Sequence, residues 1–122
     1  MAYYFLIMPI LCLFFHDLDA KGVKIAFFKQ KFKTYRGVDV ALYDYAHFNE
    51  KILGNTSYIF TLEKSIPGKE EYFKGRFGER CFFRKTFDEL EEILLEEGID
   101  IVYIIKSGQK DGILFKNAKN AV

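Results

Sequence analysis

The sequence has few of the residues from which metal centres and disulfide frameworks are built. Its two cysteines, Cys12 and Cys81, lie far apart and form no CxxC pair, so they supply neither a zinc motif nor a redox motif. We expect both to be reduced, as in a cytoplasmic protein. GxSxG and HExxH motifs are also missing, and the only Asp-x-Asp spacing, Asp17 and Asp19, falls in the amino-terminal extension. Hydrolase and metal interpretations therefore have no support, and no cofactor is expected.

A strong excess of charge of either sign is missing as well. The net charge is +1, so the whole chain is not expected to bind nucleic acid. The charges are unevenly placed, however. A basic set without acids runs through Lys21, Lys24, Lys29, Lys31, Lys33 and Arg36. An acidic set without bases follows later, at Asp88, Glu89, Glu91, Glu92, Glu96, Glu97 and Asp100. The acidic set is expected to form the solvated face of one helix.

No apolar run is long enough to cross a membrane as a helix. The longest, residues 3–15 (YYFLIMPILCLFF), falls short of the roughly 20 residues that a spanning helix needs. Residues 1–22 can be a signal-like segment or anchor, a poorly integrated extension, or a core element. A signal peptide normally carries Lys or Arg before its apolar part, and none is present here. We expect a cytoplasmic protein, with membrane association through residues 3–15 left open.

The remaining residues, 23–122, have the composition of one folded domain. Apolar residues make up 50% of the chain and aromatic residues 18%, which is enough to build a core and argues against disorder. Apolar runs predict strands over 23–28, 57–62, 81–84 and 100–105. Helical spacing of apolar residues predicts helices over 38–53, 69–77 and 86–97, the last with a Thr86–Glu89 capping box. Gly54-Asn55 and Gly98 are expected to end two of these helices, and another helix is expected from Gly112 onward.

Alternating strands and helices predict an α/β fold. Near-continuous apolar strands indicate a parallel sheet that is covered on both faces. Right-handed crossovers then favour a three-layer, Rossmann-like arrangement. Four strands are few for such a sheet, and the chain ends at Val122 inside a predicted element. We therefore expect an incomplete domain from a truncated or partial protein.

Two polar loops that contain glycine follow predicted strands and form the candidate ligand site. One comes after the first strand and the other after the fourth. In open parallel sheets ligands bind beyond the carboxyl ends of the strands, so both loops are expected to open on one edge. Cations beside a helix N-terminus would favour phosphate, diphosphate or carboxylate there. The candidate substrate-binding residues are Thr34, Arg36, Gly37, Lys106, Ser107 and Gly108.

Other motifs give weaker signals. The first loop has one glycine, so it matches neither GxGxxG nor GxxxxGK[ST]. Asp44 and His47 lie three residues apart on one helix face. Such a pair can act as a general base with its orienting carboxylate, but it is more often a structural hydrogen bond or part of a solvated face. No catalytic residue is assigned.

Three segments resemble a known family: KIAFF, TYRGVDVALYDYAHFNEKILGN and DIVYIIKSGQKDG. Together they are similar to the amino-terminal Rossmann-like domain of two-domain glycosyltransferases of the B-type fold. The closest likeness is to glycosyltransferase-like proteins of bacteria and large DNA viruses, whose first loop reads roughly Thr-x-Arg-Gly-Thr before ALYDYAH. The resemblance covers about residues 23–115. Val38 stands where the family tends to have Thr, so one hydroxyl is lost.

The resemblance implies that residues 23–122 are the acceptor-side domain of a sugar transferase. The nucleotide-sugar donor would be held by a second, carboxy-terminal domain that is not part of this chain, and a glycan or small-molecule acceptor would bind here. The six candidate residues would then face the cleft between the domains. Because transfer needs closure around both substrates, the chain alone is expected to be inactive.

Two alternatives from other functional classes remain. One is a stand-alone Rossmann-like module that binds a phosphorylated metabolite, suggested by Arg36 beside a helix start. The other is a degenerate domain that serves only in protein interactions, suggested by the abrupt end and the uncertain amino terminus.

Overall fold

The computed structural model describes residues 22–31, 37–62, 70–105 and 112–121. Five strands form one sheet: β1 (Lys24–Lys29), β2 (Thr56–Leu62), β3 (Cys81–Lys85), β4 (Ile101–Ile104) and β5 (Lys119–Ala121). Three α-helices join them: α2 (Gly37–Lys51), α3 (Glu70–Phe77) and α4 (Phe87–Glu96), with a short 3₁₀ helix η2 (Gly78–Arg80) after α3. These elements confirm the α/β class.

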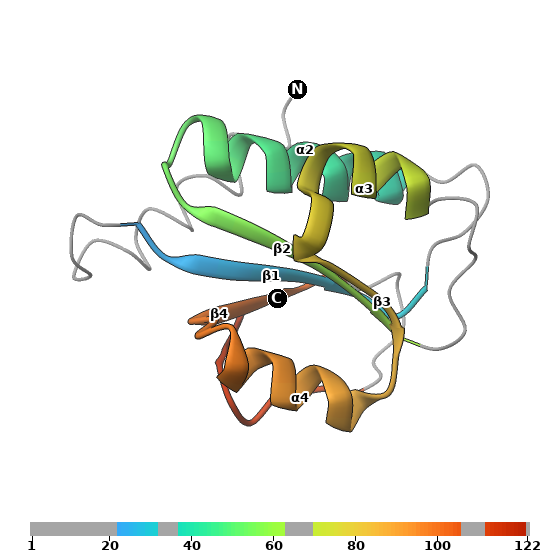
Figure 1. The fold of residues 1–122 in the computed structure, drawn as a ribbon, viewed down its shortest axis with the longest axis vertical. Helices are drawn as coiled ribbons and strands as arrows, with labels where there is room; N and C mark the ends of the chain where they lie inside the picture. Colours follow the sequence, from blue (N-terminus) through green and yellow to red (C-terminus); the bar gives the residue numbers. More distant parts are fainter. Residues whose placement is uncertain (1–21, 32–36, 63–69, 106–111, 122) are drawn as a thin grey trace.

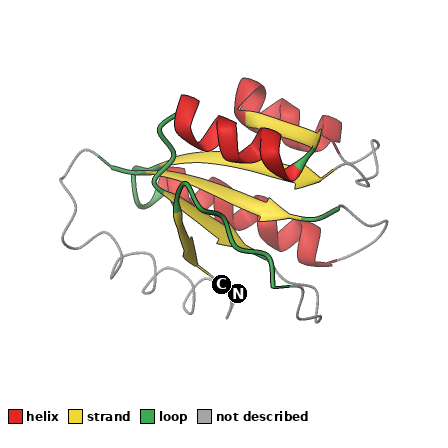
Figure 2. Ribbon diagram, turned by 90° about the horizontal axis from the view of Figure 1, so that it is seen from below, coloured by secondary structure: helices red, strands yellow, loops and turns green. Residues whose placement is uncertain are grey.

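Every strand pair in the sheet is parallel, and the strand order is β3-β2-β1-β4-β5. Strand β1 is central, because Phe27 pairs with Ile59 of β2 on one side and with Tyr103 of β4 on the other. Figure 2 shows the strand arrows sharing one direction, with helices packed on the faces of the sheet. The predicted parallel sheet is confirmed. It has five described strands rather than four.

Helices cover both faces of the sheet, which gives the three layers expected of a Rossmann-like domain. Helices α2 and α3 lie on one face and α4 on the other (Figure 1). Successive side chains of a strand point to opposite faces, so Ile25 and Phe27 belong to the core under α2 and α3. Ala26 and Phe28 belong to the core under α4. Because both faces are buried, β1 has to be apolar almost throughout.

Local signals set the ends of two helices. Thr86 caps α4, and its hydroxyl accepts a hydrogen bond from the Glu89 N–H while the Glu89 carboxylate accepts one from the Thr86 N–H. Gly98 follows α4 with a φ of 65°, a left-handed conformation that glycine adopts without steric cost. After α2, Gly54 takes a φ of 70° in the same way. The predicted capping box and both predicted stops are confirmed.

The helix expected from Gly112 onward is wrong. Residues 112–118 form a loop that leads into β5. The buried Glu91 carboxylate accepts hydrogen bonds from the N–H groups of Lys116 and Asn117, at 2.8 and 3.1 Å. Asn120 exchanges two hydrogen bonds of 2.8 Å with the backbone of Phe115. These side chains take the backbone groups that a helix would need, and Phe115 is buried under the sheet.

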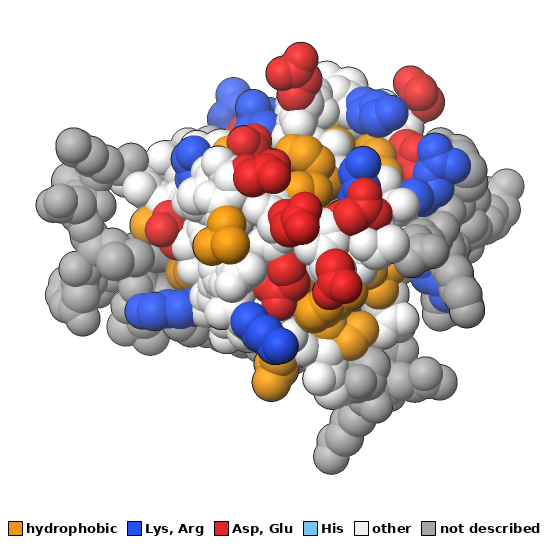
Figure 3. Space-filling view, turned by 60° about the horizontal axis from the view of Figure 1, so that its bottom comes forward, with side chains coloured by type: hydrophobic (Ala, Val, Ile, Leu, Met, Phe, Trp, Pro, Cys, Tyr) orange, Lys and Arg blue, Asp and Glu red, His pale blue; other side chains and the backbone are white. Residues whose placement is uncertain are grey.

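Most of the acidic face of α4 is solvated, as predicted. Acidic side chains gather over α4 in the space-filling view (Figure 3); Asp88, Glu89, Glu92 and Glu96 are exposed. Glu91 instead points inward and binds the loop before β5. Among the described residues, no helix is long and apolar enough to span a membrane.

Candidate functional site

The carboxyl edge of the sheet between β1 and β4 is the candidate site. The strand order reverses there, because β2 and β3 extend the sheet on one side of β1 while β4 and β5 extend it on the other. Phe28 and Ile104 are register partners, and the Ile105 N–H donates to the Phe28 carbonyl at 2.8 Å. The ends of β1 and β4 are thus adjacent. In open α/β sheets this switch point is where ligands bind.

The structure brings together the strands that carry the predicted loops. Gly37 is the first residue of α2, which begins after β1. Thr34, Arg36, Lys106, Ser107 and Gly108 lie outside the described residues. The strands that precede the two loops, β1 and β4, end side by side. This geometry agrees with the expectation that both loops start from one edge of the sheet. The ligand role of the six residues stays a prediction.

A buried ion pair lies directly beneath this edge. Lys29, the last residue of β1, pairs with Asp39 in the first turn of α2. Their exposed side-chain fractions are 3% and 2%. A carboxylate in the first turn suits the helix dipole but would repel an anionic ligand at the same helix end. The Lys29 ammonium offsets that charge, so the N-terminus of α2 can still attract an anion.

A second cation–carboxylate pair lies on the same edge, at the end of β3. Arg84 Nε is 3.0 Å from Oε2 of Glu70, the first residue of α3. Glu70 is buried, whereas about half of the Arg84 side chain is exposed. Both pairs follow one pattern, in which a strand-end cation meets a carboxylate from the first turn of a helix on the same face. Only the pair at β3 presents its cation to solvent.

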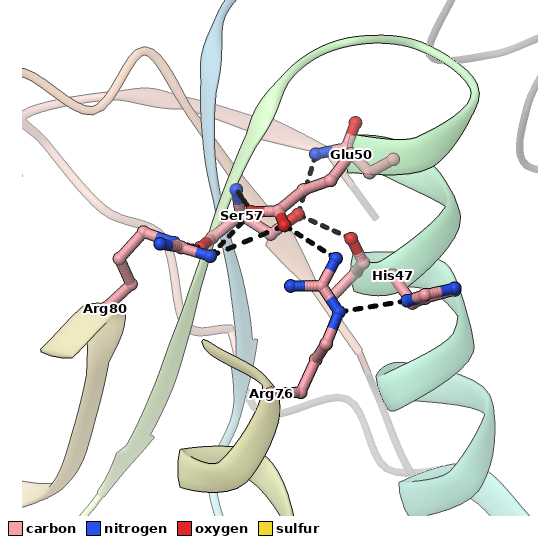
Figure 4. A network of polar contacts seen from close by, with 7 residues as sticks. His47, Glu50, Ser57, Arg76 and Arg80 are labelled. Atoms are coloured by element: carbon pink, nitrogen blue, oxygen red, sulfur yellow. Dashed lines mark hydrogen bonds and ion pairs between the residues drawn. The ribbon is translucent and has the colours of Figure 1, made fainter. Parts of the chain in front are cut away.

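The opposite, amino-terminal edge carries a polar network that ties helices to the sheet (Figure 4). The Glu50 carboxylate of α2 accepts the Ser57 N–H at 2.9 Å. It also pairs with Arg76 Nη2 at 2.8 Å and with Arg80 Nη2 at 3.1 Å. Arg80 Nε donates to the Ser57 carbonyl at 3.0 Å. This carboxylate therefore holds α2, α3, η2 and the start of β2 together.

His47 belongs to that network. Its Nδ1 accepts a hydrogen bond of 3.0 Å from Arg76 Nε, which fixes the ring orientation. The contact supports a structural role for His47, the commoner interpretation of its spacing from Asp44. Its position near the amino edge also places it away from the end of the sheet where ligands bind.

Buried amides complete the amino-terminal edge. Asn49 Nδ2 donates to the Ser57 hydroxyl at 2.9 Å, and that hydroxyl donates to the Ala46 carbonyl at 2.7 Å. Asn55 Nδ2 donates to Asn49 Oδ1, while Asn55 Oδ1 accepts the Val23 N–H. Because these buried groups satisfy one another, the cluster is expected to stabilise the fold rather than to bind a ligand.

Metal and thiol chemistry find little support in the described part of the chain. No group of three or more His, Cys, Asp or Glu side chains there could hold a metal ion. Burial raises the pKa of the Cys81 thiol to about 12, against the lowering effect of the nearby Arg80 and Lys74 charges. The thiol is therefore protonated at neutral pH and is a poor nucleophile.

Sequence reasoning missed both cation–carboxylate pairs. Lys29 belongs to the basic set of the sequence, although its place directly after an apolar strand, two residues after Phe27, is a signal that it can be buried. Asp39 was visible as an acid in the first turn of a helix. Arg84 gave no local signal, because its conformation depends on the pairing of β3 with β2.

Comparisons with protein-family models, with curated proteins and with solved structures found no match.

Proposed function

We propose that residues 23–122 form the acceptor-side, Rossmann-like domain of a two-domain glycosyltransferase. A nucleotide-sugar donor would be bound by a second domain, and the sugar would pass to an acceptor held at the carboxyl edge of this sheet. The proposal is supported by the resemblance of three sequence segments to that family. It extends to a cytoplasmic location, with which the free thiol of Cys81 agrees, since disulfides are rare there.

One structural observation supports the proposal: two of the segments that resemble the family contain strands that are neighbours at the switch point. KIAFF is β1, the long central segment contains α2, and DIVYIIKSGQKDG contains β4. The strand order makes β1 and β4 neighbours. The loops that carry the resemblance would then border a single cleft, as a domain that holds one of two substrates requires.

The chain alone is proposed to be inactive. Glycosyl transfer requires stabilisation of the leaving diphosphate and exclusion of water from both substrates. One sheet edge supplies one wall of a cleft, so a bound donor would remain hydrated and poorly oriented. Closure by a second domain would provide the missing donor contacts.

Nuclear magnetic resonance titration of the full chain tests the proposal. We expect a panel of simple glycosides to perturb backbone amides at the ends of β1 and β4 and at the start of α2. Nucleotide sugars such as UDP-glucose should show no turnover. Arg36→Gln and Ser107→Ala should weaken the glycoside perturbations, whereas Lys51→Gln, at the far end of α2, should not. Turnover of a nucleotide sugar by the chain alone, or perturbations confined to the amino edge, would refute the proposal.

A phosphate-binding module is the second candidate, favoured by the position of α2. This 15-residue helix begins at the switch point, and a helix N-terminus there suits a phosphate. The candidate predicts that Arg36→Ala weakens binding of a sugar phosphate by about 1–3 kcal/mol. Calorimetry that detects no binding of any nucleotide or sugar phosphate would eliminate it.

A further inference from the structure

Arg84 has an unusual backbone conformation for its residue type. Its φ is 55°, and it is the one described non-glycine residue with a positive φ. The left-handed region is sterically unfavourable for an L-residue with a Cβ atom, a cost that glycine avoids. The conformation coincides with a register shift between β2 and β3, where the Arg84 N–H donates to the hydroxyl of the buried Thr61 at 3.0 Å. The position would suit glycine better, yet it carries an arginine.

Among the described residues, one ion pair holds the Arg84 side chain. Its Nε lies 3.0 Å from Glu70 Oε2, and Glu70 is 5% exposed. Their contact is an ion pair without the alignment of a hydrogen bond, so the buried Oε2 has a charge partner but no hydrogen-bond donor. In the described part of the chain, Glu70 is the one residue that contacts the guanidinium, and no acceptor there faces its two terminal nitrogens.

The position of Arg84 relative to the switch point follows from the strand register. Thr61 pairs with Lys29 across β2 and β1, and Thr61 also contacts Arg84. Lys29, Thr61 and Arg84 thus form a row along the carboxyl edge. Two strand spacings, roughly 10 Å, separate the ends of β1 and β3. The switch point lies on the other side of β1, about half a strand spacing further, so a ligand bound there reaches Arg84 if it extends past the end of β2.

We propose that Arg84 forms an oxyanion subsite at this edge, with Glu70 as its positioning residue. The terminal nitrogens of Arg84 would bind a phosphate or carboxylate group of the ligand in a bidentate manner. The ion pair with the Glu70 carboxylate keeps the guanidinium at this edge of the sheet. The inference rests on the proposed function in placing the ligand at the carboxyl edge. It adds that the acceptor is acidic, carrying a phosphate or a carboxylate.

Substitution of Arg84 by glycine removes the guanidinium and tests its role in anion binding. In Arg84→Gly the relief of backbone strain is opposed by the loss of the charge partner of the buried Glu70, so the titration is run on protein shown to be folded, and anion binding should be lost. Arg84→Lys keeps the positive charge but lacks the paired N–H donors of a guanidinium. This variant should bind the anion more weakly than wild type does. Glu70→Gln tests the positioning role and should weaken anion binding less than Arg84→Gly does. Lys51→Gln removes one positive charge at the far end of α2 and is the matched control.

The probes are inorganic phosphate and acetate, titrated into the full chain at constant ionic strength. The readout is the Nε–Hε resonance of Arg84 in ¹H–¹⁵N spectra. We expect saturable shifts with at least one anion, phosphate alone indicating a phosphorylated acceptor and acetate alone a carboxylated one. Affinity should fall at least about tenfold in Arg84→Gly, measured on neighbouring backbone amides, and stay unchanged in Lys51→Gln.

Two results would overturn the inference. One is the absence of saturable shifts with either anion, and the other is equal affinity in wild type and Arg84→Gly. Neither result contradicts the proposed function if glycosides still perturb the backbone amides at the ends of β1 and β4. Conversely, anion binding at Arg84 without any glycoside effect would preserve the subsite and count against the acceptor-domain proposal.

Discussion

At the scale of single residues, the Lys29–Asp39 pair shows how a polar contact can lie inside an apolar layer. Lys29 continues the alternation of Ile25 and Phe27 towards α2, so its stem is buried with the core and its ammonium needs a partner. Asp39 is that partner. A buried pair of this kind often adds little net stability, but an unpaired member is costly.

We therefore predict strong coupling between these two positions. Lys29→Met should lower the free energy of unfolding by up to about 3–5 kcal/mol, because it removes the buried ammonium that pairs with the Asp39 carboxylate. Lys29→Met with Asp39→Leu should recover a large part of that loss. Urea denaturation of the four proteins of this double-mutant cycle measures the coupling. Additive effects of the two substitutions would show that the pair does not act as a unit.

Cys81 provides a second prediction at this scale. With a pKa of about 12, the folded-state thiol should react very slowly with iodoacetamide at about pH 8, since the thiolate is the nucleophile. In denaturing urea the thiol should react at the rate of an ordinary cysteine. Mass spectrometry of the Cys81 peptide, separated from the Cys12 peptide, gives both rates. Equal rates in the two conditions would contradict the burial of this side chain.

At the scale of elements, local signals were good predictors where one segment determines its own ends. The Thr86–Glu89 capping box and Gly98 predicted α4 because all its terminal contacts lie within a few residues. The segment after Gly112 was predicted wrongly, because its backbone is bound by Glu91, which lies 25 residues earlier. Periodicity carries no information about such distant partners.

The capping box of α4 should make part of the stability dependent on pH. A hydrogen bond from the Thr86 N–H, and a further one with its side chain, lower the pKa of the Glu89 carboxyl below its ordinary value. A lowered folded-state pKa means that the stabilisation is complete above the unfolded-state pKa. It is lost as the pH falls through the folded-state pKa.

The stability advantage of wild type over Glu89→Gln should therefore be largest near about pH 6 and shrink towards about pH 3. Thr86→Ala should cost about 1 kcal/mol at neutral pH, because the Glu89 N–H loses its acceptor. Chemical denaturation at a series of pH values measures both effects. A difference between wild type and Glu89→Gln that does not change with pH would argue against the box.

At the scale of the whole molecule, the alternation of strands and helices predicted a parallel sheet but not the order of its strands. The link from β3 to β4 passes over β2 and β1 before β4 pairs with β1. That choice depends on which faces α2, α3 and α4 cover. The alternation also led to the expectation that the two candidate loops share one edge. It could not indicate Arg84, because the conformation of that residue arises from the register shift between β2 and β3.

The strand order predicts how stability is distributed through the sheet. Strand β1 is hydrogen-bonded on both sides and buried on both faces, so its amides can exchange with solvent only when most of the domain opens. In the described sheet β5 is a three-residue edge strand that pairs with β4 alone. We expect amide exchange in Ala26, Phe27 and Phe28 to follow global unfolding, and in Asn120 and Ala121 to proceed by local opening. Native-state hydrogen exchange in increasing, sub-denaturing urea distinguishes the two, since only global opening depends strongly on urea. Equal protection of β1 and β5 would place β5 in the interior of a larger sheet, with a neighbour on its outer side.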